Sequence, residues 1–488
     1  MKISLRALLG SSASVIAATM FGPTARADRD GRAPAGEPRP VAVTVLVSEP
    51  NTADGLIFLT PTAAAPADPH GPEIVDGRGR PVWFDELPSA ESAFDLRVQR
   101  YRHEAVLTWI QSKGVFSTGP TTGYIADRHY RVIGTVQAGN ALTADIHELH
   151  LTRNGTALIT AYNTVPRDLS LVGGPTDGLV TEGVVQEINV SDGTVLFEWH
   201  SLDHVGLDES HAPLPTSTTV PWDYFHINAV SEDHDGNLLI NARNTWAVYS
   251  LDRHSGAVIW RLGGKKTDFS LGPNVQFAWQ HNPTAIDDDG LIRIFDNEAG
   301  PAILPYSRVI WVRHDDVTKA AKLERWLKHP DGLSAASQGN AQGLENGDTF
   351  VGWGQLPRFS EFDSDNKLVF DAQLATGYNS YRAYRDEWIG EPNTRPTANV
   401  QQQADGGAVV NAVWNGATEV AVWDVLDGSG DERSNDERRV LRSAPWNGLR
   451  TTIPVDEIPK TVVVVARNRA GHEIGRSVVT PVRTEARK

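Results

Sequence analysis

The middle of the chain repeats one short feature, an Asn-Gly or Asp-Gly pair between runs of apolar residues. The pairs are Asn154-Gly155, Asp192-Gly193, Asp235-Gly236, Asp289-Gly290 and Asn346-Gly347. Such pairs favour tight hairpin turns, because both residues tolerate a positive φ. The runs between them are rich in valine, threonine, tryptophan and tyrosine, which favour strands. The sequence therefore predicts an all-β protein made of many hairpins.

Larger units repeat around these turns. Each unit offers an inner strand, the turn, a second strand and then a second hairpin, and the second hairpins at 184–199, 246–264 and 357–372 are similar. The units are Asp95–Val136, His147–His200, His226–Gly264, His281–His329 and Gln338–Leu374, with a partial unit at Gly55–Leu87 that Ser380–Trp388 is expected to complete. Repeats of roughly 40–50 residues that can each form a four-stranded sheet are typical of a β-propeller. We expect a six-bladed β-propeller over residues 40–392, with five or seven blades as alternatives.

The two ends of the chain differ from the repeats. Residues 1–27 have the pattern of a signal peptide, with a basic start, a short apolar stretch and a small-residue cleavage site. Beyond the linker at Gly390–Asn399, strand-like runs follow one another closely, which predicts a small immunoglobulin- or fibronectin-like β-sandwich over residues 396–488. We expect a secreted, extracellular protein, and no later segment is apolar enough to span a membrane.

Composition excludes several classes of function. The formal net charge is −16, which argues against nucleic acid as a partner, because phosphate binding needs a basic patch. An anionic substrate would need a local cationic pocket that works against this overall field. The chain has no cysteine, so neither disulfides nor thiolate chemistry is available. Nothing in the sequence indicates an oligomeric state.

Three consecutive units begin with a histidine at nearly the same place. His147, His226 and His281 stand eight to ten residues before the glycine of their turn. The first strand of a propeller blade lines the central channel, so equivalent positions point at a common axis. A single strand histidine is more often structural, and this class is assigned to His150, His200, His204, His254, His314 and His329. Three at one register predict a shared site.

An arginine and an amide are predicted to join the second of these histidines. If Asp235-Gly236 forms a two-residue loop, Asn228 lies opposite Arg243 and shares a strand face with His226. A guanidinium matches the geometry of sulfate, phosphate or carboxylate. Glu298 is placed opposite His281, where it could orient the imidazole.

Three kinds of function suit this set of side chains. Imidazoles beside a guanidinium could transfer or cleave an anionic group. Three histidines with an open position could instead bind a metal in a hydrolase or lactonase, although a fixed positive charge disfavours a dication. The propeller could also be a non-catalytic extracellular binding module.

At these residues the sequence resembles the PAPS-independent arylsulfotransferase family, and more closely its divergent branch with a C-terminal β-sandwich. The similar segments are "DIHELHLTRNGTALI", "DYFHINAV", "LLINAR", "FAWQHNPTAIDDDGLIRIFDN" and "GNAQGLENGDTFVGWG", and the resemblance covers most of residues 55–392. It implies sulfuryl transfer from an aryl sulfate ester to a phenolic acceptor, without a nucleotide donor, through a sulfohistidine intermediate and with ping-pong kinetics.

The resemblance also implies roles for individual residues. His281 would be the nucleophile. His226, Asn228 and Arg243 would bind the sulfuryl oxygens, and His226 would also exchange the phenol proton. His147 would be the substrate-binding counterpart of an earlier histidine of the family, with His150 as a less favoured match. No metal and no other cofactor is implied. The sequence departs from the family pattern at Asn282, where a small hydroxyl residue is usual, and it lacks the extra N-terminal β-domain.

Overall fold

The computed structural model of the chain describes residues 37–65, 67–114, 119–403, 407–429, 438–456 and 460–482. These residues form mostly strands. Their helical segments are three 3-10 turns, η1 (Ser170–Val172), η2 (Ser201–Asp203) and η3 (Leu207–Glu209). Nothing in these described ranges is a helix that could cross a membrane. The predicted all-β class is confirmed, whereas the predicted signal peptide at 1–27 lies outside the described residues.

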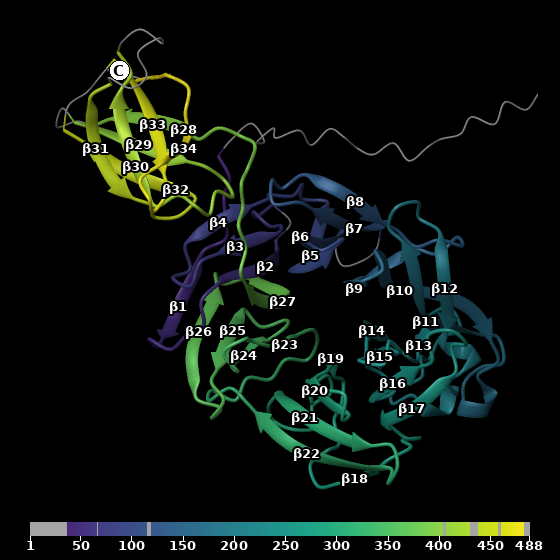
Figure 1. The fold of residues 1–488 in the computed structure, drawn as a ribbon. Coiled ribbons are helices and arrows are strands. Elements are labelled where there is room, and N and C mark those ends of the chain that lie inside the picture. Colours follow the sequence, from purple (N-terminus) through teal and green to yellow (C-terminus); the bar gives the residue numbers. More distant parts are fainter. Residues whose placement is uncertain are drawn as a thin grey trace, which may run out of the picture.

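In the described part of the chain, six sheets lie around a common centre (Figure 1). From the innermost strand outwards, they are β5 (Glu91–Tyr101), β6 (Glu104–Lys113), β7 (Thr121–Ala126) and β8 (Val132–Val136); β9 (Ala144–Leu151), β10 (Thr156–Arg167), β11 (Gly178–Asn189) and β12 (Val195–His200); β14 (Ile227–Glu232), β15 (Leu238–Ala242), β16 (Ala247–Leu251) and β17 (Val258–Gly263); β19 (His281–Ala285), β20 (Leu291–Asp296), β21 (Arg308–Asp315) and β22 (Ala320–Leu327); β23 (Asn340–Gly343), β24 (Thr349–Gly352), β25 (Arg358–Phe362) and β26 (Leu368–Leu374); and β27 (Tyr378–Asp386), β2 (Leu56–Ala63), β3 (Glu73–Val75) and β4 (Pro81–Phe84). The innermost strand of each sheet contacts the innermost strands of both neighbouring sheets. The six inner strands therefore surround one axis.

Two pairings between distant parts of the chain close this ring. β27 pairs with β2 from Leu56↔Asp386 to Ala63↔Tyr378, so the predicted completion of the partial unit is confirmed. β1 (Val43–Ser48) adds a fifth strand beside β26, which the sequence did not predict. Two short strands, β13 (Trp222–Asp223) and β18 (Ser270–Leu271), pair in parallel with β11 and β22.

Apolar side chains fill the spaces between neighbouring sheets. One core cluster joins Leu158 and Val185 of the second sheet to Val230, Ile240 and Tyr249 of the third, and all five are buried. Burying each such side chain contributes roughly 1.5–3 kcal/mol of transfer free energy. A single sheet could not bury both of its faces, so the ring is stabilised by contacts between neighbours.

Beyond residue 396, the described residues form two further sheets. One contains β28 (Thr397–Gln402), β29 (Ala408–Val413) and β32 (Arg450–Val455); the other contains β31 (Val440–Pro445), β30 (Val422–Asp427), β33 (Thr461–Arg467), β34 (Glu473–Arg476) and β35 (Thr480–Pro481). They share a core that includes Val410, Trp423, Ile453 and Val464.

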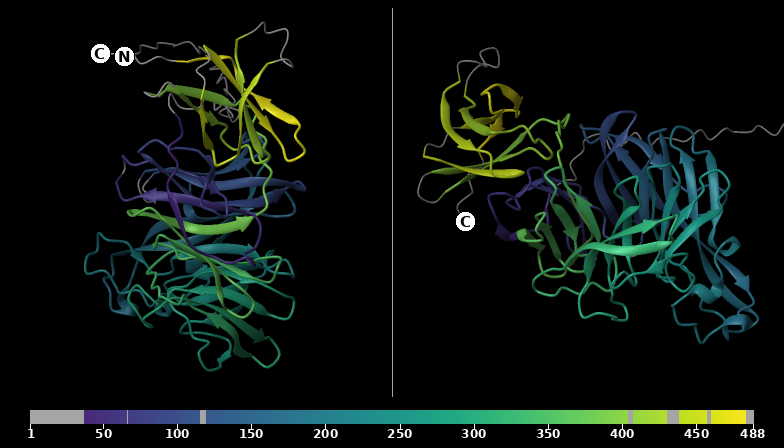
Figure 2. Two further views of the ribbon diagram at one scale, coloured as in Figure 1. Left: turned by 90° about the vertical axis from the view of Figure 1, so that its left-hand side faces the viewer. Right: turned by 60° about the horizontal axis from the view of Figure 1, so that its bottom comes forward.

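This C-terminal unit is fixed to one side of the ring (Figure 2). The side-chain amide of Asn415 bonds both main-chain groups of Phe84, each at 2.9 Å. The Tyr130 hydroxyl donates to the Gly416 carbonyl at 2.8 Å. Direct hydrogen bonds therefore join the two parts.

Candidate active site

The inner strands are irregular where the predicted histidines lie. The pairing of β9 with β10 is interrupted between Ala144 and Leu149, which spans His147. His226 precedes β14 with a φ of +54°, and the register of β19 shifts directly after His281. Bulges and left-handed residues turn side chains out of the regular alternation of a strand. The backbone at these three histidines therefore departs from a regular strand, as it often does beside a functional site.

The hairpin of the third sheet corrects a predicted register. Asp233 N–H donates to Asn237 O at 2.9 Å, so the loop holds three residues, not two. The strand pairing is consequently Ala229↔Asn241, and Asn228 lies in a bulge instead of opposite Arg243. His226 lies outside the regular strand, and its carbonyl accepts a hydrogen bond from Arg243 N–H at 2.9 Å.

The structure brings the three predicted histidines together. The rings of His147 and His226 lie 5.2 Å apart at 79°. Tyr162 of β10 contacts both rings, at 5.9 and 5.8 Å. His281 begins the next inner strand, β19, which contacts β14; Gln338 N–H donates to its Nε2 and, two residues away, Ala336 O accepts from Arg243, each at 3.2 Å. Three neighbouring sheets thus each bring one histidine to this part of the ring.

His281 is held as a neutral imidazole. Its side chain is buried, and burial followed by the charge of Arg243 holds its pKa well below the usual value. Nδ1–H donates to Asn297 Oδ1 at 2.7 Å, because the Asn297 amide group itself donates to the carbonyls of Ala335 and Gln338. Nε2 accepts the Gln338 N–H at 3.2 Å. The lone pair of His281 is therefore on Nε2.

The other two histidines are each oriented by a nearby carboxylate. Asp223 lies 2.5 Å from His226 Nδ1, and Asp145 lies 2.9 Å from His147 Nδ1. A carboxylate at Nδ1 fixes the tautomer and leaves Nε2 for chemistry. Neither acid was predicted from the sequence, although each stands two or three residues before its histidine.

Arg243 has no carboxylate partner among the described ion pairs. Its guanidinium donates to three neutral acceptors, Asn244 Oδ1 at 2.9 Å, Ala336 O at 3.2 Å and Gly300 O at 3.3 Å. It also lies 4.7 Å from the ring centroid of Trp279, on which it stacks. The guanidinium is therefore held in place without a direct carboxylate contact among the described residues, with Asp223 near enough to act on its charge, and its geometry suits an anion.

Two of the predicted side chains are used differently. Asn228 is fully buried, and its amide donates to Gln280 O at 3.0 Å and accepts from Asn241 at 2.5 Å. It joins neighbouring inner segments, which gives no support for its predicted role in binding an anion. Glu298 does not lie opposite His281, because His281 pairs with Phe295.

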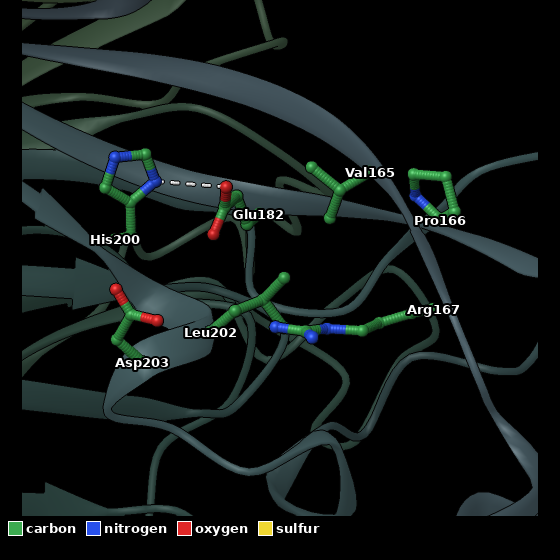
Figure 3. A pocket seen from close by; sticks show the side chains of 7 residues that line it. All are labelled: Val165, Pro166, Arg167, Glu182, His200, Leu202 and Asp203. Carbon is green, nitrogen blue, oxygen red and sulfur yellow. Dashed lines mark hydrogen bonds and ion pairs between the residues drawn. The ribbon is translucent and has the colours of Figure 1, made fainter.

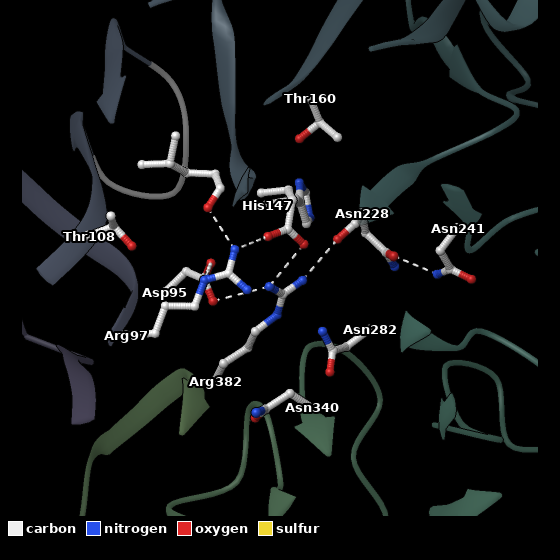
Figure 4. A network of polar contacts seen from close by, with 12 residues as sticks. Asp95, Arg97, Thr108, His147, Thr160, Asn228, Asn241, Asn282, Asn340 and Arg382 are labelled. Atoms are coloured by element: carbon white, nitrogen blue, oxygen red, sulfur yellow. Dashed lines mark hydrogen bonds and ion pairs between the residues drawn. The ribbon is translucent and has the colours of Figure 1, made fainter. Parts of the chain in front are cut away.

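A buried ionic network occupies the centre of the ring beside the histidines. Figure 4 shows polar residues of the inner strands here, among them Asp95, Arg97, Asn228, Asn282, Asn340 and Arg382. Glu148 of β9 belongs to the same network, and Arg97 makes ion pairs with both Asp95 and Glu148. The guanidinium of Arg382 is fully buried and donates to Asp95 and Glu148, both at 3.1 Å, and to Asn228 O at 3.2 Å. This one side chain links β27 to three other inner strands, and the sequence analysis did not identify it.

A separate hollow of about 340 Å³ lies beside β10, β11 and β12, lined by Val165, Pro166, Arg167, Glu182, His200, Leu202 and Asp203 (Figure 3). His200 bonds Glu182 at 3.0 Å and Glu198 at 3.1 Å. Burial opposes the charged form, but these two carboxylates outweigh it and raise the pKa of His200. The three converging histidines do not line this hollow.

Across the described residues, no three His, Cys, Asp or Glu side chains are grouped so that they could hold a metal ion.

Glu298 should make stability depend on pH. Burial and the neighbouring Asp296 raise the pKa of Glu298 to about 8, against 4.5 as its ordinary value. Between these values the unfolded chain loses a proton that the folded chain keeps, so stability falls as the pH rises through this window. Raising the pH from about 5 to about 8.5 should lower the free energy of unfolding of the wild type. In Glu298→Gln, which has no carboxyl group to ionise at this position, the decrease should be smaller by roughly 1–3 kcal/mol. Urea unfolding at both values measures this, with the exposed Glu345→Gln as control. Equal pH dependence in all three proteins would contradict the assignment.

Comparisons with known proteins agree with the resemblance of the sequence. The family model described as "Arylsulfotransferase (ASST)" matches residues 97–375. No curated protein matches the chain. Solved structures that are similar include a protein of unknown function from Bacteroides caccae (13% identity, 68% of this chain and 100% of that one, TM-score 0.41) and a protein from Lactobacillus plantarum (14%, 82% and 100%, TM-score 0.37). A catalytically inactive variant of virginiamycin B lyase from Staphylococcus aureus is also similar (10%, 79% and 94%, TM-score 0.32). Likenesses this distant add nothing to a functional argument.

Proposed function

Because the chain belongs to the arylsulfotransferase (ASST) family, we propose that it moves a sulfuryl group from an aryl sulfate ester to a phenolic acceptor without a nucleotide donor. One observation carries this proposal. The Nε2 lone pair of the buried, neutral His281 faces the Gln338 N–H at 3.2 Å, and two residues away the Ala336 carbonyl accepts from the guanidinium of Arg243, whose charge lowers the pKa of His281. A nucleophile beside a fixed positive charge suits attack on an anionic ester.

The transfer then follows in two half-reactions. Nε2 of His281 bonds to sulfur while the bond from sulfur to the aryl oxygen breaks. The departing phenolate takes a proton from Nε2 of a protonated His226, whose charge is offset by Asp223. In the second half, the acceptor phenol returns a proton to His226 as its oxygen bonds to sulfur and the nitrogen–sulfur bond breaks. The free enzyme is restored, so ping-pong kinetics follow.

The surrounding groups stabilise the charge that moves in these steps. Arg243 holds the sulfuryl oxygens, with His147 alongside. The Gln338 N–H faces Nε2 of His281 and would lie beside the oxygens once sulfur is bound there. Asn297 Oδ1 accepts from Nδ1–H and supports the positive charge of a sulfated imidazole. Fixed dipoles of this kind contribute most where charge develops.

The same proposal covers the architecture and the location of the protein. The six sheets would be the blades of a β-propeller over residues 40–392, and the last two sheets an immunoglobulin- or fibronectin-like sandwich over 396–488. Residues 1–27 would direct export, so the protein would act outside the cytoplasm.

The direct test is sulfuryl transfer by the purified protein. We expect sulfated acceptor from a mixture of an aryl sulfate and a phenol, with parallel lines in double-reciprocal plots. Protein quenched with donor alone should carry one SO₃ group on the peptide that contains His281. Activity that chelators remove and a divalent metal restores would favour the metal-dependent hydrolase instead. Tight binding of the ester without turnover would favour a binding module.

A further inference from the structure

Two tyrosines flank the histidine pair, and their hydroxyl groups differ in one respect. Tyr162 O–H donates to Ile227 O at 2.7 Å, so it is used within the fold. The Tyr381 hydroxyl is buried and has no hydrogen-bond partner among the described residues. Buried polar groups are nearly always paired, so an unpaired hydroxyl in a candidate site indicates a missing partner.

The position of Tyr381 is set by its neighbours. Its ring meets Phe94 edge-on at 6.2 Å and His147 at 5.7 Å. The guanidinium of Arg382 lies 5.1 Å from its ring centroid. The hydroxyl is also near enough to Tyr162 to raise the pKa of that phenol. Tyr381 lies where the pairing of β27 with β2 is interrupted, and these contacts hold its ring beside His147.

The Tyr381 hydroxyl is suited to donate. Burial, ahead of the charges around it, raises its pKa well above the usual value, so it keeps its proton at any working pH. A neutral donor that the protein does not use is what a bound anion needs.

We propose that Tyr381 O–H donates a hydrogen bond to an oxygen of the anion held between His147, His226 and Arg243. This inference rests in part on the proposed function, because in that reaction the acceptor is a sulfuryl oxygen and Tyr381 is a further catalytic residue. It also applies to inorganic sulfate, which has the same oxygens but undergoes no transfer.

The matched pair Tyr381→Phe and Tyr162→Phe tests it. Calorimetric titration with inorganic sulfate should show about 10–100-fold weaker binding for Tyr381→Phe, as for loss of one hydrogen bond to a charged group. Tyr162→Phe should change sulfate affinity by less than about threefold. The two variants should differ in the opposite sense in their equilibrium constants for folding. Tyr381→Phe removes an unpaired hydroxyl and should leave this constant unchanged or raise it. Tyr162→Phe should lower it about 5–10-fold, because Ile227 O loses its donor.

The possible outcomes separate this inference from the proposed function. Sulfate binding that depends on Tyr381, in a protein without transferase activity, would support the donor and reject the reaction. Equal sulfate affinity in Tyr381→Phe and the wild type, or no sulfate binding by the wild type, overturns the inference even if transfer occurs. A loss of stability in Tyr381→Phe equal to that in Tyr162→Phe also overturns it, because the hydroxyl would then have an internal partner.

Discussion

Replacing His281 with glutamine is expected to reduce sulfuryl transfer by at least about a thousandfold. Glutamine has a polar side chain of similar length, so its amide N–H can still donate a hydrogen bond to Asn297 Oδ1. It has no imidazole lone pair, so no covalent intermediate can form. The initial rate with a chromogenic aryl sulfate and excess phenol measures the loss, and quenched protein should carry no SO₃ group.

His200→Gln is the matched control for this variant. His200 is also a histidine bonded through both ring nitrogens, but it lines the separate hollow beside β10–β12. We expect its transfer rate to stay within about threefold of the wild type. Transfer at the wild-type rate by His281→Gln would reject His281 as the nucleophile, and an equal loss in both variants would point to a general structural effect.

The largest loss of stability is expected for Arg382→Met. The guanidinium of Arg382 holds Asp95 and Glu148 in the interior, and its charge keeps the pKa of Glu148 below the usual value although burial opposes this. Without it, two buried carboxylates lose one of their arginine partners and keep Arg97. Breaking one side of a buried ion pair costs roughly 3–5 kcal/mol. Urea unfolding should show this decrease in the free energy of unfolding.

Two further variants identify the cause. Adding Glu148→Gln to Arg382→Met leaves Asp95 paired with Arg97, removes the excess buried negative charge, and should restore part of the loss. Arg313 makes ion pairs with Asp287 and Glu324 that are open to solvent, so Arg313→Met should cost about 1 kcal/mol or less. If Arg382→Met cost no more than Arg313→Met, the network would not stabilise the ring.

Local patterns in the sequence predicted much of this fold. Turn pairs and strand-forming runs indicate hairpins through interactions between residues that are close in the chain. The shared register of His147, His226 and His281 predicted their convergence, because equivalent strands of a repeat face the same axis. One added loop residue was enough to misplace Asn228, since the side-chain period of a strand is two.

The remaining site residues depend on contacts that no local pattern encodes. Asn297 orients His281 only because the segment around Ala335 and Gln338 fixes its amide. Arg382 bonds Asp95 across 287 residues of sequence. A single sequence gives no sign of which distant carboxylate such an arginine will meet.

The joining of β27 to β2 also constrains when the protein can work. Thr60 N–H reaches Ser380 Oγ across 320 residues, so this contact must wait until almost the entire ring has been synthesised. Tyr381 and Arg382 arrive on that same last strand. Contacts of such long range form late and slowly. A nascent chain would therefore carry its histidines without the strand that completes their surroundings, and the proposed catalysis would begin only when the two ends have met.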